Sequence, residues 1–469
     1  MYRIQRLDFK QHFSEQVNFE AVSRVIPANV VEEVIAECGV EEERRRKLPA
    51  TLTVWLCLLM NIFSGIGLQA VLVRMVRGTR LVVGAGLEVT ANKSSISKAR
   101  YRLGVEPLRR LFSRLCQPLA RPDDPTAFRY GLRLIALDST VEQAADTPAN
   151  EAAFGRQPGT RNSAGSAFPQ VRCVYACECG THAIFDAIFM PYRTGDIHGV
   201  RQLLRCIDNA MLVMLDAGLF GADLIATIRD RGSHVVCRVS SIVRPRCEQR
   251  LADGSYLSHL TVYDAQRRPT GQRVPIRVIE YTFDDPQRPG YQLVHRLLTT
   301  LLDPVRYPAL DLICLYHERW EIELTIDELD THQRLLSTPL HSHKPDGVLQ
   351  ELYGLLLAHY LVRAIMYQAA LTIAVDPDRL SFVTAVRLIS DAVADFQLVT
   401  PTQHPKLWQR LLNDLVYTLL PPRDNRINPR VVKRQRTIFA VKRPHHLHPP
   451  QPLKSFCAGI VVLPQLSTP

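Results

Sequence analysis

The order of strand-like and helix-like segments between residues 131 and 240 constrains the fold most strongly. LRLIALDST is predicted to be a buried strand that ends in an acid, Asp138, and AMLVMLDAG is predicted to be a second one that ends in Asp216. Between them, FPQVRCVYACEC and HAIFDAIFMP form a predicted hairpin around Gly180, followed by the helix pattern DIHGVRQLLRCID with Asp196 as its expected N-cap. The helix pattern FGADLIATIRDRG and the strand HVVCRVSS follow. This order of three strands, helix, strand, helix and strand predicts an α/β domain.

A later helix supplies a third acid. The stretch YHERWEIELTIDELDTHQ, residues 316–333, places Tyr316, Arg319 and Glu323 at spacings of three and four residues, so a helix would carry them on one face. A solvated face of mixed charge is the ordinary explanation for such a helix. Two strands that end in aspartate, with a later helix that carries glutamate, are however the layout of a ribonuclease H-like domain.

Length and charge limit the function classes. A chain of 469 residues exceeds what one hydrophobic core usually holds, and 46% hydrophobic with 22% charged residues is typical of a globular protein. The net charge of +11 favours a polyanionic partner such as nucleic acid, although membrane surfaces are also anionic.

No part of the sequence predicts export or a membrane span. The N-terminus MYRIQRLDFKQHF lacks an apolar signal region, and the apolar run from Leu48 to Phe63 is shorter than the ~20 residues that cross a bilayer. We expect a cytoplasmic protein with no membrane partner. The eleven cysteines are accordingly expected to be reduced thiols, and Cys173, Cys177 and Cys179 fit an alternating strand better than a zinc site.

Basic segments outside the α/β region are candidate DNA contacts. In NKSSISKARYRLG, Ser94 or Ser95 could cap a short helix that presents Lys98, Arg100 and Arg102. A recognition helix and an ordinary solvated basic helix explain this pattern equally well. The run RRRK at 44–47 reads as a basic loop, and RDNRINPRVVKRQRTIFAVKRPHH at 423–446 reads as a disordered arm compatible with DNA contact.

The fold class expected is therefore α/β: a ribonuclease H-like catalytic domain with an inserted β-subdomain, a helical N-terminal domain and a helical C-terminal region. The expected boundaries are 1–125 for the helical DNA-binding domain, 126–335 for the catalytic domain with its β-rich insertion at about 241–305, 336–420 for the helical C-terminal region, and 421–469 for a basic, proline-rich tail.

Three carboxylates in this layout suit phosphodiester cleavage by two metal ions. One ion activates the nucleophile and the other stabilises the leaving oxygen, about 3.5 to 4 Å away. Magnesium prefers oxygen ligands and keeps several waters, so three acids suffice when the substrate phosphate adds further ligands. An aspartate at a strand end is usually a turn or cap residue, so the prediction rests on all three acids fitting one topology.

The sequence resembles the DDE transposases of bacterial insertion sequences, in the insertion-sequence-four family. Tyr316, Arg319 and Glu323 match the first three members of the family signature Y-x2-R-x3-E-x6-K. The segments ALDST with DTPANEAAFGR, and MLDAGLF, look like its first and second acid regions, while LPATLTVWL and SISKARYRLG resemble its helical N-terminal domain. The likeness covers most of residues 30–335.

This resemblance implies roles for individual residues. Asp138, Asp216 and Glu323 would be the catalytic acids and would bind two Mg²⁺ ions, with Mn²⁺ as an alternative. Arg319 and Tyr316 would contact DNA at the element end. The partners implied are double-stranded DNA at the element ends and at the target, and a second copy of the chain in a synaptic homodimer at the bacterial nucleoid. In relatives an aromatic ring of the insertion can stack on a displaced base, for which Tyr256, Tyr263, Tyr281 and Tyr291 are the candidates here. Packing within a strand is the ordinary explanation for each of them, and none is assigned this role.

One signature position differs. Asp330 stands where the family has its lysine, and Arg334 is the nearest cation that could replace it. If the helix runs unbroken from Tyr316, Asp330 faces the DNA end, and Asp330→Lys would tighten binding and raise cleavage.

The function expected is that of a transposase which cuts the ends of its own element and joins the 3′ ends to target DNA. Two alternatives stay open: a stand-alone ribonuclease H-fold nuclease, and a catalytically impaired DNA-binding protein derived from a transposase, which Asp330 leaves possible. A gene that lies between short inverted repeats would favour the transposase, and a cleavage assay would separate the transposase from the impaired DNA-binding protein.

Overall fold

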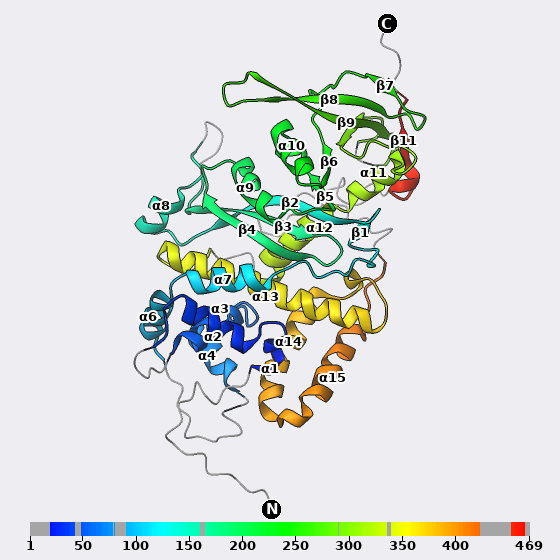
Figure 1. The fold of residues 1–469 in the computed structure, drawn as a ribbon. Helices are drawn as coiled ribbons and strands as arrows, with labels where there is room; N and C mark the ends of the chain where they lie inside the picture. Colours follow the sequence, from blue (N-terminus) through cyan, green and yellow to red (C-terminus); the bar gives the residue numbers. More distant parts are fainter. Residues whose placement is uncertain are drawn as a thin grey trace, which may run out of the picture. The chain divides into compact units, whose positions relative to one another are not determined.

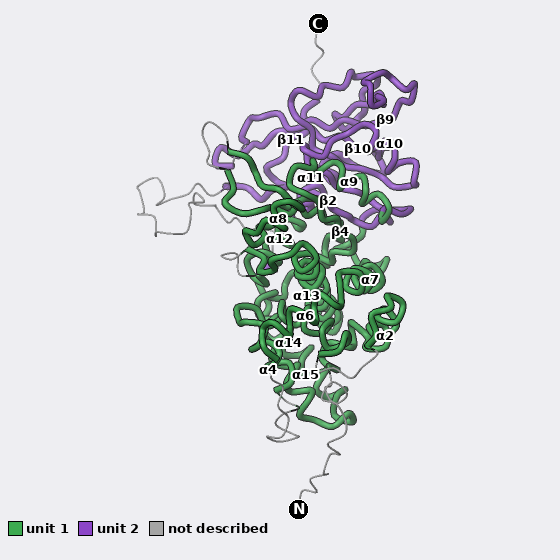
Figure 2. Tube along the Cα trace, turned by 90° about the vertical axis from the view of Figure 1, so that its left-hand side faces the viewer, with its two compact units in different colours: residues 1–128, 137–206, 321–420 green, residues 129–136, 207–320, 421–469 purple. Residues whose placement is uncertain are grey.

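The computed structural model describes residues 19–42, 48–77, 79, 91–159, 165–288, 290–334, 339–422 and 452–464. The basic run at 44–47 and the arm at 423–446 lie outside these residues. The chain divides into two compact units (Figure 2). Unit 1 holds residues 1–128, 137–206 and 321–420, and unit 2 holds residues 129–136, 207–320 and 421–469.

Unit 1 begins with helices, as the sequence predicts for the first 120 residues (Figure 1). Its N-terminal helices are α1 (Glu20–Ser23), α2 (Ala28–Glu37), α3 (Ala50–Leu59), α4 (Leu68–Met75), α6 (Lys93–Leu103) and α7 (Glu106–Leu115). Further along the chain lie α8 (Pro148–Phe154), α9 (Asp196–Leu203), η2 (Leu204–Cys206), α12 (Trp320–Asp327, of which Trp320 belongs to unit 2), η4 (Glu328–Gln333), α13 (Pro345–Thr372), η5 (Pro377–Arg379), α14 (Phe382–Leu398), η6 (Pro401–Gln403) and α15 (His404–Val416).

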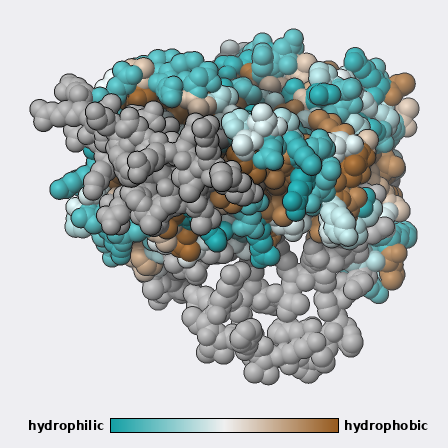
Figure 3. All heavy atoms as spheres, turned by 90° about the horizontal axis from the view of Figure 1, so that it is seen from below, coloured by the Kyte–Doolittle hydropathy of each residue, from teal (hydrophilic) through white to brown (hydrophobic). Residues whose placement is uncertain are grey.

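The core of unit 1 forms around α13, which packs against α3, α7, α14 and α15. By length and composition α13 could cross a membrane, but 89% of its most apolar window is buried inside the protein. Core helices have the same composition. On the face drawn in Figure 3, hydrophilic side chains are interspersed among hydrophobic ones.

The strands of unit 1 follow the order β4-β3-β2, in which β3 (Gln170–Glu178) and β4 (Ala183–Pro191) form the predicted antiparallel hairpin. Gly180 turns this hairpin with φ +85°, and a Cβ at this position would lie 2.5 Å from the backbone oxygen of Thr126. Glycine is therefore required there. Asp196 is not the N-cap of α9, since Gly195 occupies that position and Asp196 instead pairs with Arg172.

Strand β2 (Leu132–Gln143) begins in unit 2 and continues into unit 1 at residue 137. In unit 2 the strand order is β2-β5-β6-β10-β9-β8-β7. The elements are β1 (Phe128–Arg129, with Phe128 in unit 1), β5 (Met211–Leu215), η3 (Ala217–Leu219), α10 (Ala222–Asp230), β6 (His234–Arg238), β7 (Gln249–Arg250), β8 (Tyr256–Tyr263), β9 (Pro269–Phe283), β10 (His295–Thr299), α11 (Ala309–His317), η9 (Cys457–Gly459) and β11 (Ile460–Val462).

The predicted strand and helix order is confirmed. The strand pattern ending at Asp216 is β5, FGADLIATIRDRG contains α10, and HVVCRVSS contains β6. The strand expected to end at Asp138 is β2, which instead continues to Gln143. Strand β5 pairs in parallel with both β2 and β6, and strands β7 to β10 occupy residues 249–299. The short helix α8 between β2 and β3 was not predicted; its N-cap is Thr147, whose side chain accepts a hydrogen bond from Asn150 N.

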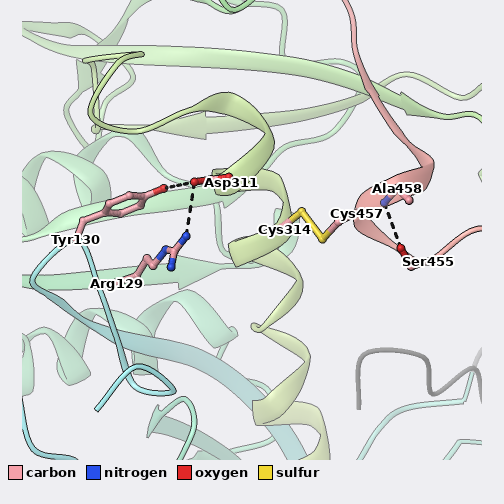
Figure 4. Close-up of a disulfide and its surroundings, with 7 residues drawn as sticks. All are labelled: Arg129, Tyr130, Asp311, Cys314, Ser455, Cys457 and Ala458. Carbon is pink, nitrogen blue, oxygen red and sulfur yellow. Dashed lines mark hydrogen bonds and ion pairs between the residues drawn. A yellow bond between two sulfur atoms is a disulfide. The ribbon is translucent and has the colours of Figure 1, made fainter. Parts of the chain in front are cut away.

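The C-terminal segment 452–464 docks within unit 2. Strand β11 pairs antiparallel with β9, and Cys457 forms a disulfide with Cys314 on α11 (Figure 4). Phe456 stacks on His317 with 3.9 Å between ring centroids, and Lys454 Nζ lies 2.6 Å from Asp284 Oδ2. The expectation that every cysteine is a reduced thiol is therefore wrong for this pair. A contact between positions 143 residues apart leaves no local sequence pattern.

Candidate active site

The two predicted aspartates occupy equivalent positions on neighbouring strands. The parallel register of β2 and β5 ends with Ala136 opposite Met214, and Asp138 and Asp216 each follow two residues later. Both side chains are half-buried. The Asp138 carboxylate accepts a hydrogen bond from Ser139 N at 2.8 Å, and Asp216 is the N-cap residue of η3.

Glu323 lies on α12 and is also half-buried. The neighbouring positions Glu321 and Ile322 are buried, and the Glu321 carboxylate accepts a hydrogen bond from Gly180 N. The Thr325 hydroxyl donates to Glu321 O at 2.8 Å. These contacts fix which face of α12 points inward, and they leave Glu323 on the partly exposed side.

Tyr316 and Arg319 lie in unit 2, and both side chains are buried. Their exposed fractions are 8% and 5%. The Tyr316 hydroxyl donates a hydrogen bond to Leu215 O at 3.0 Å, and burial raises the pKa of this phenol above its ordinary value. The Arg319 guanidinium lies 5.9 Å from the Tyr316 ring centroid. Tyr316 therefore touches the residue that precedes Asp216.

The helix that carries the signature is not continuous. Helix α11 ends at His317, α12 begins at Trp320, and residues Glu328–Gln333 form a π-helix. The premise that placed Asp330 on the DNA side is therefore wrong. Asp330 is half-buried, its Oδ1 is buried without a hydrogen-bond partner, and its charge acts on the buried side chains Cys173 and Tyr175 of β3.

Arg334 does not replace the signature lysine either. Its guanidinium pairs with Glu142 on β2, and 13% of the Arg334 side chain is exposed. Burial lowers the pKa of Arg334. Arg334 therefore forms an ion pair inside unit 1, because the buried carboxylate of Glu142 needs a positively charged partner.

The environment of Asp330 predicts a pH-dependent stability. Burial, with a smaller contribution from Asp327, raises the pKa of Asp330 to about 7. The folded state then holds this proton more tightly than the unfolded state, so Asp330 lowers stability as pH rises from about 4 to about 7. Asp330→Asn should raise the free energy of unfolding by about 1 to 3 kcal/mol at pH 8 and by much less at pH 5. Denaturant titration at both pH values measures this difference.

Asp391→Asn is the control for this measurement, because the Asp391 side chain is 73% exposed. Its effect should be below about 0.5 kcal/mol at both pH values. An Asp330→Asn effect that is equal at pH 5 and pH 8 would show that this carboxyl titrates in its ordinary range.

Helix α6 presents only part of the predicted basic surface. Its N-cap is Asn92, whose side chain accepts from Ser95 N, rather than Ser94 or Ser95. Arg100 is 7% exposed and donates to Gly347 O at 2.9 Å and to Gln350 Oε1 at 3.2 Å, both on α13. Its predicted DNA contact is therefore not supported, because the side chain anchors α6 to the core. Lys98 and Arg102 are exposed, and Arg102 also donates to Leu48 O at 2.7 Å.

A buried ionic cluster that the sequence did not reveal lies next to η4. The cluster comprises His182, Glu328, His359, Arg363 and Asp378. Arg363 Nε donates to Glu328 Oε2 at 2.9 Å, and His359 Nε2 lies 3.1 Å from the same oxygen. Burial alone raises the pKa of Glu328, but Arg363 and His182 bring it well below its ordinary value. His359 and Arg363, which interrupt the apolar second half of α13, were the available sequence signal.

This cluster does not fit the magnesium ions expected from the sequence. Within the described part of the chain, His182, Glu321 and Asp378 place ligand atoms within 4.8 Å of one another. However, Arg363 pairs with His182 and Glu328, and its Nη1 lies 3.9 Å from Asp378 Oδ1. The guanidinium already supplies the positive charge, and magnesium prefers oxygen ligands to histidine nitrogen.

Known families match most of the chain. The family described as insertion element 4 transposase N-terminal matches residues 16–113, and the family described as transposase DDE domain matches residues 129–361. The chain is also 29% identical to the transposase InsG for insertion sequence element IS4 of Escherichia coli (strain K12), over 92% of this chain and 95% of that protein. The chain belongs to the IS4 family of DDE transposases. The resemblance to this family and the expected enzyme class are thus confirmed.

A solved structure gives a second comparison. The piggyBac transposase, in a synaptic complex with hairpin DNA, aligns with 88% of this chain and 87% of its own, with a TM-score of 0.42 and 12% identity. Within the IS4 family, the match to the DDE domain and the mixed sheet with its helices define a ribonuclease H-like α/β fold. The transposase is an enzyme that cleaves DNA and transfers strands, and its family uses divalent metal ions.

Proposed function

We propose that Asp138, Asp216 and Glu323 hold two Mg²⁺ ions, with Mn²⁺ as a substitute, at the reaction centre of this transposase. The observation that carries the proposal is that all three acids lie within the matched DDE domain, with the two aspartates at equivalent positions of the β2 and β5 register. Each is a carboxylate on a partly exposed position, which suits an ion that keeps waters and accepts substrate oxygens. The bound ions would activate the attacking oxygen and stabilise the leaving oxygen.

The protein side chains would then bind and orient the ions and the DNA end. Arg319 would bind a DNA phosphate, as the resemblance to the family implies. Its guanidinium lies 5.9 Å from the ring centroid of Tyr316, whose hydroxyl donates to Leu215 O, next to Asp216. A guanidinium can hold a phosphate through two parallel hydrogen bonds. Lys98 and Arg102 would add DNA contacts from the N-terminal domain.

The finer organisation is part of the same proposal. Residues 1–125 would bind DNA, 126–335 would form the catalytic domain interrupted by the β-rich insertion at about 241–305, and 336–420 would support it. Residues 421–469 would form a C-terminal tail, of which 452–464 dock within unit 2. The transposase would work as a synaptic homodimer at the nucleoid. Of the four candidate stacking tyrosines, Tyr263 is 56% exposed, while Tyr256 and Tyr281 are buried. Tyr263 is therefore best placed to stack on a displaced base.

A cleavage assay tests the proposed function. The purified protein is incubated with DNA that carries the inverted repeats flanking its gene, with Mg²⁺ or Mn²⁺, and then with target DNA. Cuts confined to the element ends, followed by joining of the 3′ ends, are expected. Binding without cleavage in either metal would favour the impaired DNA-binding protein, and cuts throughout the fragment would favour a nuclease.

Lys98 should make a measurable phosphate contact. Replacing Lys98 with alanine should weaken binding to all DNA sequences alike and reduce the slope of log affinity against log salt by about 1. Fluorescence anisotropy with end DNA and unrelated DNA across a salt series measures both effects. Lys406→Ala, at an exposed position of α15, is the charge-matched control. Equal slopes for the two variants would remove Lys98 from the interface.

A further inference from the structure

Helix α12 needs side-chain contacts within unit 1 to fix its orientation. Residues 318 and 319 form a turn between α11 and α12, and α12 stops at Asp327, where the π-helix begins. A helix of eight residues is too short to be stable by itself in water, so tertiary contacts must hold it. The rotation of α12 about its axis, and with it the direction of Glu323, therefore depends on the side chains that α12 buries.

Glu321 is a polar anchor of α12. This residue is 7% exposed, and its carboxylate accepts a hydrogen bond from Gly180 N in the turn of the β3–β4 hairpin. Thr325 lies one turn further along the same face and is fully buried, with its Oγ1 3.6 Å from Cys177 Sγ on β3. Strand β3 is the hydrogen-bonded neighbour of β2, which carries Asp138. These contacts attach α12 to the part of the sheet that holds the first acid.

The helical repeat directs Glu323 away from this anchor. Residues two positions apart in an α-helix are about 200° apart around its axis, so an inward-pointing Glu321 places Glu323 on the opposite side. The exposure of the two residues agrees, since Glu321 is buried and Glu323 is half-buried. The donor also has a fixed place, because the turn at Gly180 packs so closely on the Thr126 backbone that a Cβ would not fit.

We propose that Glu321 is a positioning residue that sets the rotation of α12 and so directs the Glu323 carboxylate toward the metal ions. The proposal rests on the proposed function, in which Glu323 is a metal ligand. Groups that orient a metal ligand typically contribute about 10-fold to 100-fold in metal affinity. Without the carboxylate of Glu321, Gly180 N would lose this partner and α12 would be free to turn. Such a turn would withdraw Glu323 from the ions and leave the DNA-binding surfaces unchanged.

Two substitutions of similar size separate the hydrogen bond from packing. Glu321→Gln keeps an oxygen that can accept from Gly180 N, whereas Glu321→Met removes it. Glu321→Asp is a milder change, which keeps the charge but shortens the side chain. Glu351→Met is the matched control: Glu351 is also a buried acid of unit 1, on α13, and it accepts from a backbone amide, His341 N, at 2.9 Å.

Three quantities are measured for each variant and for the wild type: Mn²⁺ affinity by electron paramagnetic resonance, end-DNA affinity without a divalent metal, and single-turnover cleavage as a function of Mg²⁺ concentration. Thermal melts select a temperature at which the proteins are folded. Glu321→Met should lose about 10-fold or more in Mn²⁺ affinity, with a matching shift of the Mg²⁺ dependence and end-DNA affinity within about 2-fold of the wild type. Glu321→Asp should show a smaller loss in the same direction. Glu321→Gln and Glu351→Met should stay within about 3-fold of the wild type in all three quantities.

Three results would overturn the proposal. The first is unchanged Mn²⁺ affinity in Glu321→Met, and the second is an equal loss in Glu351→Met. The third is an equal loss in Glu321→Gln and Glu321→Met, which would show that the charge of Glu321 binds the ion directly, beside His182 and Asp378. Glu323→Gln is measured alongside; if it binds Mn²⁺ as the wild type does, the metal-ligand assignment itself has failed.

Discussion

Asp138→Asn, Asp216→Asn and Glu323→Gln should each reduce cleavage of the element ends by about 1,000-fold or more, while end-DNA affinity stays close to that of the wild type. Metal ions stabilise the charge of the transition state by several kcal/mol, and each step of about 1.4 kcal/mol changes the rate tenfold. The amide side chains keep the size of the acids and remove the charge that holds the ions. Single-turnover cleavage and anisotropy on the same end DNA measure the two quantities.

Asp327→Asn is the matched control for this set. Asp327 lies on the same helix as Glu323, one turn further along, and is exposed. Its amide variant should cleave at a rate within a few-fold of the wild type. If Asp216→Asn still cleaves, Asp216 is not a catalytic residue. If a variant loses DNA binding together with cleavage, the substitution has disrupted the fold rather than the chemistry.

Arg363→Met should lower the free energy of unfolding by about 3 to 5 kcal/mol, because it leaves the buried Glu328 charge without its guanidinium partner. The Arg363 side chain is 2% exposed, so water cannot compensate for the loss. The variant should melt at a markedly lower temperature in thermal unfolding at neutral pH. Arg109→Met is the control: that side chain is 52% exposed in its pair with Glu106, and such surface pairs contribute about 0 to 1 kcal/mol.

The pH dependence and a second substitution separate the lost charge pair from lost packing. In the wild type the pKa of Glu328 is lowered, so its stabilising contribution is present above the ordinary range of a glutamate and is lost as pH falls through the lowered pKa. Without Arg363, burial raises that pKa, and the penalty of Arg363→Met should shrink from pH 8 to pH 5. Adding Glu328→Gln to Arg363→Met should recover part of the loss at pH 8. A penalty that is independent of pH and of Glu328 would identify packing as the cause.

The sequence predicted those features that depend on local pattern. The strand that carries Asp138, the strand that precedes Asp216 and the Gly180 hairpin follow from apolar patterns and turn residues, which neighbouring positions determine. The three acids were predicted because two strands and a later helix fit one topology, and the signature around Glu323 agrees with that topology. All three acids lie within residues 129–361, which the transposase DDE domain family matches.

Other features depend on contacts between distant elements. Arg100 has its partner Gln350 at a separation of 250 residues, so a basic helix pattern could not show that it points inward. The breaks on either side of α12 and the burial of Asp330 depend on packing against β3 and α13. The spacing of residues in a signature carries no information about such packing. The Cys314–Cys457 disulfide has the same origin, since it joins a core helix to a segment beyond a basic arm.

Strand β11 covers part of an edge of β9, and this limits self-association of unit 2. On one side of β9, strand β10 pairs with it as far as Tyr281. On the other side, strand β8 pairs with β9 only as far as Val278. Residues Ile460–Val462 take over that second side at Tyr281–Phe283, so the backbone groups left uncovered by β8 are paired. An unpaired strand edge is a template for the same edge of another molecule. The C-terminal segment thus works as an edge cover, and a chain shortened before residue 452 would expose a site for intermolecular β-sheet growth.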